Sequence, residues 1–256
     1  MQDRIMGAIL IQTDYRGLSL YMIFILSSFV VGLVAAFLLM IKDKVPMYVI
    51  WSSIVLNALM IAFGGMLLSV LASGFKSCGL SSVGGAVGVF AAIFTIARIM
   101  PAYREQVFKA YGCIIPLMYS VSKLACHFTG CCYGREYDGV FRIHYEGMSE
   151  RIPTADVFPV QMSETILFAI IFIIGVVIVY VKKAEHGIFV LACMSAVGKL
   201  LLDYLRDSHA ANMLVPSLNQ ILCLVIIAIG AVLAYSEPVK RVVLGTYKAK
   251  VETTTR

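Results

Sequence analysis

The feature that most constrains the fold of this chain is a succession of apolar runs, each about long enough to cross a lipid bilayer. A spanning helix needs about 20 mostly apolar residues. Seven runs qualify, at residues 17–41, 47–73, 84–100, 108–127, 159–181, 187–206 and 214–235. Of the 256 residues, 60% are hydrophobic and only 14% are charged, which excludes an ordinary soluble domain. The sequence therefore predicts an all-α, multi-pass membrane protein with about seven transmembrane helices.

The distribution of basic residues predicts how these helices are oriented. Lys and Arg are concentrated in alternate connections and in the C-terminal segment, while the intervening connections hold fewer of them. Because cytoplasmic loops carry an excess of Lys and Arg, we expect the N-terminus outside the cell and the C-terminus in the cytoplasm. The net charge of +6 then reflects topology. It indicates the membrane surface, and no nucleic acid, as the partner of the basic cytoplasmic tail at 236–256.

Outside the apolar runs the chain has one sizeable polar insertion, at residues 133–158, which we expect on the extracytoplasmic side. No repeat or long linker divides the chain, so residues 1–256 are predicted to form a single integral membrane domain. A plain solvated loop is the favoured interpretation of the insertion, although its alternating apolar side chains could form a short β-hairpin. The alternating residues are Val140, Phe141, Ile143 and Tyr145.

Polar residues inside the apolar runs are costly in a bilayer, so each marks either a functional site or a paired structural ion. Spacings of three or four residues place the members of each run on one face of its helix. They are Tyr119, Lys123 and His127 in the fourth run, Gln161 and Glu164 in the fifth, and Lys199, Asp203 and Arg206 in the sixth.

Two explanations fit these charges. Within the sixth run alone, Lys199 and Arg206 could simply be neutralised by Asp203 on the same helix. Three runs that each present a polar face instead favour a shared hydrated cavity, open toward the outer leaflet. Its three basic residues outnumber its two acids, so we expect an anion to bind there, and lipid phosphate is the abundant anion of a membrane.

The stretch CHFTGCCYG, at residues 126–134, gathers soft and reactive side chains: Cys126, His127, Cys131 and Cys132. Their spacing does not match a standard zinc motif, so a metal is the interpretation that it favours least, and no cofactor is predicted. Three alternatives stay open. The cysteines could form a disulfide, with Cys78 as a candidate partner, supply a thiolate made reactive by neighbouring basic groups, or pack in a tight turn.

The order of these residues resembles the prolipoprotein diacylglyceryl transferases, seven-span enzymes of the bacterial inner membrane. Their signature G-R-x-G-N-F-x-N-G-E-x-x-G aligns without gaps to residues 122–134. Their H-P-x-Q-x-Y-E motif aligns to 158–164, and their Y-G-x-x-R-F-x-x-E-F-x-R motif aligns to 195–206. The family residues retained are Gly130, Gly134, Pro159, Gln161, Glu164 and Arg206, with Asp203 as a conservative change.

The chain departs from the family pattern at positions that carry the family's chemistry. The signature arginine is Lys123 here, and the second arginine is Lys199. The Asn and Glu of the signature are Cys126 and Cys131, and the family's H-G-G histidine falls at Val83. Outlying members of the family carry G-C-C-Y-G in this place, so the cysteines indicate a divergent branch.

The resemblance implies transfer of a diacylglyceryl group from phosphatidylglycerol to the cysteine thiol of a lipoprotein precursor, or to another thiol or hydroxyl acceptor. Such a transfer needs a clamp for the leaving phosphate and a base for the thiol. If this chemistry is kept, the residues that we expect to be catalytic are Lys123, His127, Cys131, Cys132 and Lys199. The substrate-binding residues implied are Tyr119, Gly130, Gly134, Gln161, Glu164, Asp203 and Arg206. The alternatives are a membrane thiol oxidoreductase and a non-enzymatic phospholipid-binding or transport protein.

Overall fold

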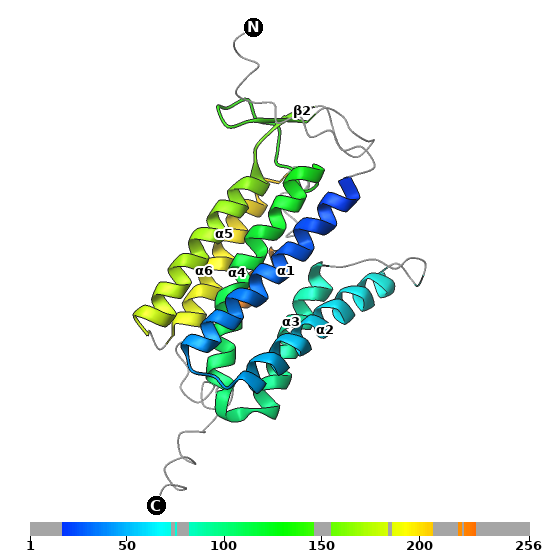
Figure 1. Ribbon diagram of the computed structural model, residues 1–256. Coiled ribbons are helices and arrows are strands. Elements are labelled where there is room, and N and C mark those ends of the chain that lie inside the picture. Colours follow the sequence, from blue (N-terminus) through cyan, green and yellow to red (C-terminus); the bar gives the residue numbers. More distant parts are fainter. Residues whose placement is uncertain are drawn as a thin grey trace, which may run out of the picture. The chain divides into compact units, whose positions relative to one another are not determined.

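A computed structural model describes residues 17–72, 75, 82–145, 155–183, 186–206, 220–221 and 223–228 (Figure 1). Its helices are α1 (Gly17–Lys42), α2 (Met47–Ala72), α3 (Ser82–Ile99), η1 (Pro101–Tyr103), α4 (Arg104–Thr129), α5 (Val160–Val176), η2 (Val177–Val181) and α6 (Gly187–Asp203). Two short strands, β1 (Ile143–Tyr145) and β2 (Ala155–Val157), lie between α4 and α5. The predicted all-α class is confirmed.

Helices form at six of the seven predicted positions, and the described residues of the seventh run are helical. Three described segments are long and apolar enough to cross a membrane: Leu20–Lys42, Met47–Leu68 and Val160–Val181. A further pair, Val87–Ile99 and Pro101–Thr129, qualifies only when taken together and is bent by 117°. The described residues thus hold three or four candidate spans. Seven spans, and the orientation of the termini, stay predictions.

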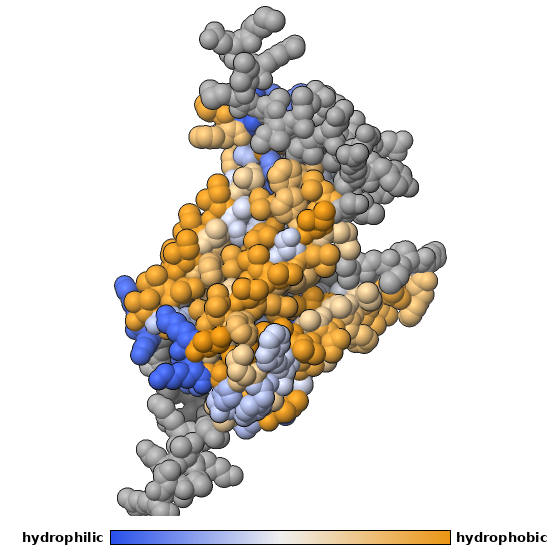
Figure 2. All heavy atoms as spheres, in the orientation of Figure 1, coloured by the Kyte–Doolittle hydropathy of each residue, from blue (hydrophilic) through white to orange (hydrophobic). Residues whose placement is uncertain are grey.

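The sides of the helices are apolar, as expected for surfaces that meet lipid. Figure 2 shows hydrophobic side chains along the helices and hydrophilic ones gathered near their ends. On α1, for example, Ile23, Val30 and Leu38 are each more than half exposed. A helix that is hydrophobic all round belongs in a membrane or a large core, so these exposed side chains support a multi-pass membrane protein.

The chain divides into two compact units, one of residues 1–32 with 113–235 and the other of residues 33–112 with 236–256. In the second unit, α2 and α3 approach at glycines. A Cβ atom on Gly88 would lie 2.0 Å from the carbonyl oxygen of Met60, which only glycine avoids. That the whole chain forms a single membrane domain stays a prediction.

In the first unit, the C-terminal half of α4 lies beside α5, and α5 lies beside α6 (Figure 1). Ser120 on α4 donates a hydrogen bond through Oγ to the carbonyl oxygen of Thr165 at 2.7 Å. Thr165 returns one through Oγ1 to the carbonyl oxygen of Ser120 at 3.3 Å. These reciprocal bonds fix the register of α4 against α5, and so set which polar side chains face each other.

The polar insertion is not simply a solvated loop, because it contains a short pair of strands, the alternative that the alternation had left open. β1 pairs antiparallel with β2, so that Tyr145 lies opposite Ala155. Val140 and Phe141 do not join a strand, and they are 89% and 76% exposed. The alternation marked β1 correctly, while β2 is only three residues long and was not singled out.

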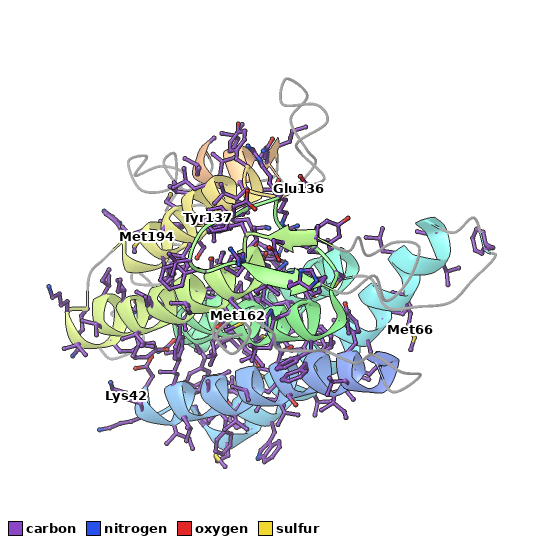
Figure 3. The ribbon with its side chains drawn as sticks, turned by 90° about the horizontal axis from the view of Figure 1, so that it is seen from above. Lys42, Met66, Glu136, Tyr137, Met162 and Met194 are labelled. Carbon is purple, nitrogen blue, oxygen red and sulfur yellow. The ribbon has the colours of Figure 1, made fainter. Side chains whose placement is uncertain are left out.

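Residues 133–137 form a strap that joins the end of α6 to the start of α5. The amide of Arg135 donates to the carbonyl oxygen of Leu205 at 3.0 Å, and its carbonyl oxygen accepts from the amide of Phe158 at 2.9 Å. Figure 3 shows this strap from above, with Glu136 and Tyr137 labelled. The strap therefore fixes the ends of the two helices that carry most of the polar residues.

Candidate functional site

The candidate site is centred on Glu164, whose side chain is completely buried near the start of α5. Its Oε1 accepts hydrogen bonds from Lys199 Nζ at 2.6 Å, Arg206 Nη2 at 2.9 Å and Tyr119 Oη at 3.2 Å. Its Oε2 lies 3.0 Å from Lys123 Nζ and 3.0 Å from Arg206 Nη2. One carboxylate thus receives three cations and a phenol from two neighbouring helices.

Asp203 completes this group, which we call the ion cluster: Tyr119, Lys123, Glu164, Lys199, Asp203 and Arg206. Asp203 Oδ1 lies 3.5 Å from both Lys199 Nζ and Arg206 Nε. The local neutralisation considered for the sixth run is therefore present. The same two cations also reach Glu164 at shorter distances, so the shared site between helices is present as well.

The ion cluster carries an excess positive charge. Lys123, Lys199 and Arg206 contribute three positive charges, against two negative charges on Glu164 and Asp203. Arg206 and Lys123 are each only 8% exposed. A buried charge of one sign is costly unless it is paired, so this arrangement favours a bound anion. Lysine donates up to three hydrogen bonds and arginine five, which leaves donors for such a ligand.

His127, the predicted base, lies on α4 one turn beyond Lys123, but it is not among the described side chains that bond to Glu164. Eight residues turn an α-helix by about 80° relative to its starting face, so His127 has moved off the face that Tyr119 presents. The imidazole is 3% exposed, and its Nδ1 has no hydrogen-bond partner among the described residues. The predicted common face therefore holds for Tyr119 and Lys123, and His127 lies to one side.

Gln161 connects the ion cluster's helix to the cysteine turn and to the insertion. Its Nε2 donates to the carbonyl oxygen of Cys131 at 2.9 Å and to Tyr145 Oη at 3.3 Å. Tyr145 in turn donates to the carbonyl oxygen of His127 at 3.4 Å. Burial raises the pKa of Tyr145 to about 12, so its hydroxyl keeps its proton at neutral pH. Sequence reasoning placed Tyr145 in a strand, and nothing in the alternation indicated its contact with the site.

The turn after α4 depends on a glycine. Gly130 adopts a φ of 68°. Its amide donates to the carbonyl oxygen of His127, and the amide of Cys131 donates to the carbonyl oxygen of Cys126 at 3.1 Å. This pair of bonds is a Schellman motif, the common way of ending a helix at a left-handed residue. Cys132 follows with a φ of 58°, which is unusual for a residue with a side chain.

Gly134 is fixed by close packing. A Cβ atom at Gly134 would lie 2.4 Å from the carbonyl oxygen of Phe158 and 2.9 Å from Val160 Cγ2. The backbone of Gly134 also forms a β-bridge with Arg206. Both glycines predicted to bind substrate thus shape the backbone around the site.

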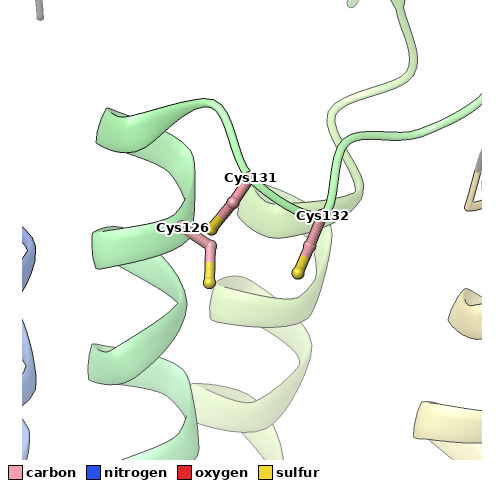
Figure 4. Close-up of side chains that lie close together, drawn as sticks. All are labelled: Cys126, Cys131 and Cys132. Atoms are coloured by element: carbon pink, nitrogen blue, oxygen red, sulfur yellow. The ribbon is translucent and has the colours of Figure 1, made fainter. Parts of the chain in front are cut away.

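The turn gathers three thiols, which we call the thiol cluster: Cys126, Cys131 and Cys132. Their Sγ atoms all lie within 4.8 Å of one another (Figure 4), and all three are free thiols. Cys132 is exposed, while Cys126 and Cys131 are partly buried. Hydrogen bonds with the other two thiols lower the pKa of Cys132. The predicted disulfide partner Cys78 lies outside the described residues.

These features define an all-α, multi-pass membrane protein with a buried, cation-rich site between three helices. Over residues 9–236 the sequence matches the family model described as prolipoprotein diacylglyceryl transferase. The chain therefore belongs to the prolipoprotein diacylglyceryl transferase family, membrane transferases that modify lipoproteins. No curated protein matches the chain.

Proposed function

We propose that the protein transfers the diacylglyceryl group of phosphatidylglycerol to the cysteine thiol of a lipoprotein precursor, in the bacterial inner membrane. The observation that carries this proposal is the convergence of Lys123, Lys199 and Arg206 on the buried Glu164. All four residues fall at positions of the family motifs. The two arginine-to-lysine changes keep the charge of the cluster, although they give up the bidentate fork of a guanidinium.

The ion cluster would act as the clamp for the lipid phosphate. A phosphodiester carries one negative charge, which would balance the single excess positive charge of the cluster. As the bond to the glyceryl carbon breaks, negative charge grows on the leaving phosphate, and cations fixed in a water-poor site stabilise it. Glu164 and Asp203 would hold the cations in position, and Tyr119 would add a neutral donor.

The acceptor thiol would approach from the side of the cysteine turn. In the reaction, the sulfur forms a bond to the terminal glyceryl carbon, the bond from this carbon to the phosphate oxygen breaks, and glycerol phosphate leaves. The thiol proton must go to a base, for which we propose His127, because its buried Nδ1 has no partner among the described residues. Gln161 Oε1, which likewise has no partner there, would accept a hydrogen bond from the lipid headgroup.

The test is transfer from labelled phosphatidylglycerol to a lipobox peptide by the reconstituted protein, followed by mass spectrometry. Lys123→Ala and Lys199→Ala should each lower the transfer rate about 10²- to 10³-fold, the range for removal of one preorganised charge-stabilising group. Lys109→Ala is the matched control, because the described partner of Lys109 is the exposed Glu105 on its own helix. Unchanged rates in both site variants would reject the proposed clamp.

A membrane thiol oxidoreductase is the second candidate, and the closeness of the three sulfurs favours it. It predicts that alkylation of Cys126, Cys131 and Cys132 differs between reduced and oxidised membranes. Identical labelling under both conditions would exclude it. If phosphatidylglycerol remains bound through purification without any turnover, the third candidate, a lipid-binding or transport protein, replaces both enzymes.

A further inference from the structure

The thiol cluster has no role in the clamp described above, although the backbone brings its three sulfurs together. Cys126 comes from the last turns of α4, whereas Cys131 and Cys132 come from the turn that follows. The left-handed residues Gly130 and Cys132 reverse the chain, so that the two later side chains point back toward α4 (Figure 4). Sulfurs from two different backbone segments thus meet at one point.

We propose that Cys126, Cys131 and Cys132 bind one divalent thiophilic metal ion of the Zn²⁺ type, with a fourth coordination position open for the acceptor thiol. The binding of the metal stands on the geometry of the thiol cluster alone. The role of the open position rests on the proposed transferase function.

The distances fit such a site. Zinc–thiolate bonds of about 2.3 Å around a tetrahedral ion place the sulfurs about 3.8 Å apart. The three sulfurs already lie within 4.8 Å of one another, so no pair needs to close by more than about 1 Å. Thr129 Oγ1 lies 3.5 Å from Cys131 Sγ and can donate to it, as the partners of metal-bound thiolates commonly do.

The spacing of Cys126, His127, Cys131 and Cys132 does not suit a closed structural zinc site, which has four protein ligands. A site with three protein ligands that keeps one position open for water or substrate is the catalytic arrangement instead. Among the described residues, no fourth Cys, His, Asp or Glu joins the thiol cluster. The open position can face outward, because Cys132 is exposed.

The charges of the two clusters complement each other. Before lipid binds, three thiolates around a divalent ion carry one net negative charge, beside the one net positive charge of the ion cluster. The two clusters are also linked, since Gln161 bonds to the carbonyl oxygen of Cys131 and lies one turn before Glu164 on α5. A metal in the thiol cluster would therefore hold an acceptor thiol beside the proposed phosphate clamp.

Metal coordination would activate the acceptor, because a thiol bound to Zn²⁺ loses its proton outright. The proton passes to His127 or to solvent. The bound thiolate sulfur then forms its bond to the glyceryl carbon, and the phosphate oxygen leaves with the electron pair of the breaking bond. The product is a thioether, a weaker ligand than a thiolate, which favours its release from the metal.

The test uses the full-length protein in lipid nanodiscs with Co²⁺ as a spectroscopic probe of the zinc position. We expect one Co²⁺ per chain, with the near-ultraviolet charge-transfer absorption of thiolate ligands, and its displacement by Zn²⁺. Cys126→Ser, Cys131→Ser and Cys132→Ser should each weaken binding at least about tenfold. Cys193→Ser, in α6 and outside the cluster, should bind as the wild type does. Absence of thiolate absorption in the reduced wild-type protein would overturn the proposal without reliance on any variant.

The open position is tested separately, by adding a short peptide with one cysteine to the Co²⁺-loaded protein. A new thiolate absorption, absent with the matched serine peptide, is the expected result, and equal spectra with both peptides would reject an acceptor position. Transfer activity distinguishes the two proposals. Full activity after the metal is removed by a chelator would leave the transferase standing and reject the metal's part in it. Metal binding without any transfer would leave the metal site standing and reject the transferase.

Discussion

Gln161 links the helix of Glu164 to the thiol cluster, but the ion cluster and the thiol cluster are built in opposite ways. Apart from Arg206, the ion cluster lies on regular helices, and Glu164 and Asp203 are almost completely buried. The thiol cluster depends on two left-handed residues, and Cys132 is exposed. Buried charges must remain balanced if the helices are to pack, whereas a turn at the surface can change its side chains at little cost. We therefore expect changes in the ion cluster to affect both stability and the proposed phosphate clamp, and changes in the thiol cluster to affect chemistry with little effect on stability.

The departures from the family pattern follow the same division. If the chain aligns with the family motifs as the sequence predicts, Lys123 and Lys199 stand in place of arginines and keep the charge of the ion cluster. Cys126 and Cys131 then stand in place of an amide and a carboxylate, which would change the chemistry of the thiol cluster. The difference suggests that a divergent branch of the family altered how the acceptor is held while it kept the charge balance around the donor lipid.

The largest effect is expected from Glu164→Gln, which leaves three buried cations without their main counter-charge. Removal of one partner from a buried ion pair lowers the unfolding free energy by roughly 3 to 5 kcal/mol. The loss is measured by titration with SDS in mixed micelles, where the variant should unfold at a lower SDS fraction. Glu105→Gln is the control, because the Glu105 side chain is 71% exposed and should change stability by less than about 1 kcal/mol. Equal losses in the two variants would show that Glu164 has no special structural role.

A smaller loss is expected from Gly134→Ala. The new methyl group would lie 2.4 Å from the carbonyl oxygen of Phe158, so the strap or the start of α5 must shift, at a cost of about 1 to 3 kcal/mol. Gly85→Ala should instead raise the unfolding free energy. The nearest atom to its new Cβ would be Ile61 Cγ2 at 3.7 Å, an ordinary contact distance, and alanine favours the helix. The same unfolding titration measures both, and a stable Gly134→Ala protein would contradict the packing described for the strap.

Lys123→Arg should raise the transfer rate by up to about tenfold, equivalent to about 1.4 kcal/mol of barrier. The guanidinium restores two parallel hydrogen bonds to a phosphate and keeps the charge that Glu164 requires. The readout is the peptide transfer assay, with Lys109→Arg as the control. A fall of more than tenfold would instead show that the site is shaped around the ammonium group.

The smallest effect on stability is expected from Cys132→Gly. Glycine adopts a φ of 58° without penalty, so the unfolding free energy should stay unchanged or rise by up to about 1 kcal/mol, while Co²⁺ binding is lost. Cys193→Gly, within α6, should lower stability by about 1 kcal/mol and leave Co²⁺ binding intact. A large loss of stability in Cys132→Gly would show that the thiol cluster is structural after all.

Regular spacing explains which parts of the site the sequence could predict. Apolar runs located α1 and α2 to within one residue at their ends. Spacings of three and four correctly grouped Lys199, Asp203 and Arg206. Grouping by spacing fails over longer intervals, because an α-helix does not repeat exactly every four residues, and so His127 lies away from Glu164.

Contacts between distant segments could not be predicted, because they depend on pairing that leaves no periodic pattern. Tyr145 lies on β1, whose partner is residues 155–157, a segment too short for its alternation to indicate a strand, and Tyr145 accepts a hydrogen bond from Gln161. The close approach of the three sulfurs likewise depends on the left-handed φ of Cys132, which its residue type does not favour. The sequence placed these residues near one another along the chain, but not their mutual geometry.

The ion cluster also sets a requirement for biogenesis. A lysine within an isolated transmembrane helix costs up to about 2.5 to 3.5 kcal/mol on insertion scales, the largest cost being at the helix centre. Lys123 is synthesised before its counter-charge Glu164, and Lys199 follows after it. We therefore expect α4 to be retained by the insertion machinery until α5 arrives, so that the three helices enter the bilayer as a group.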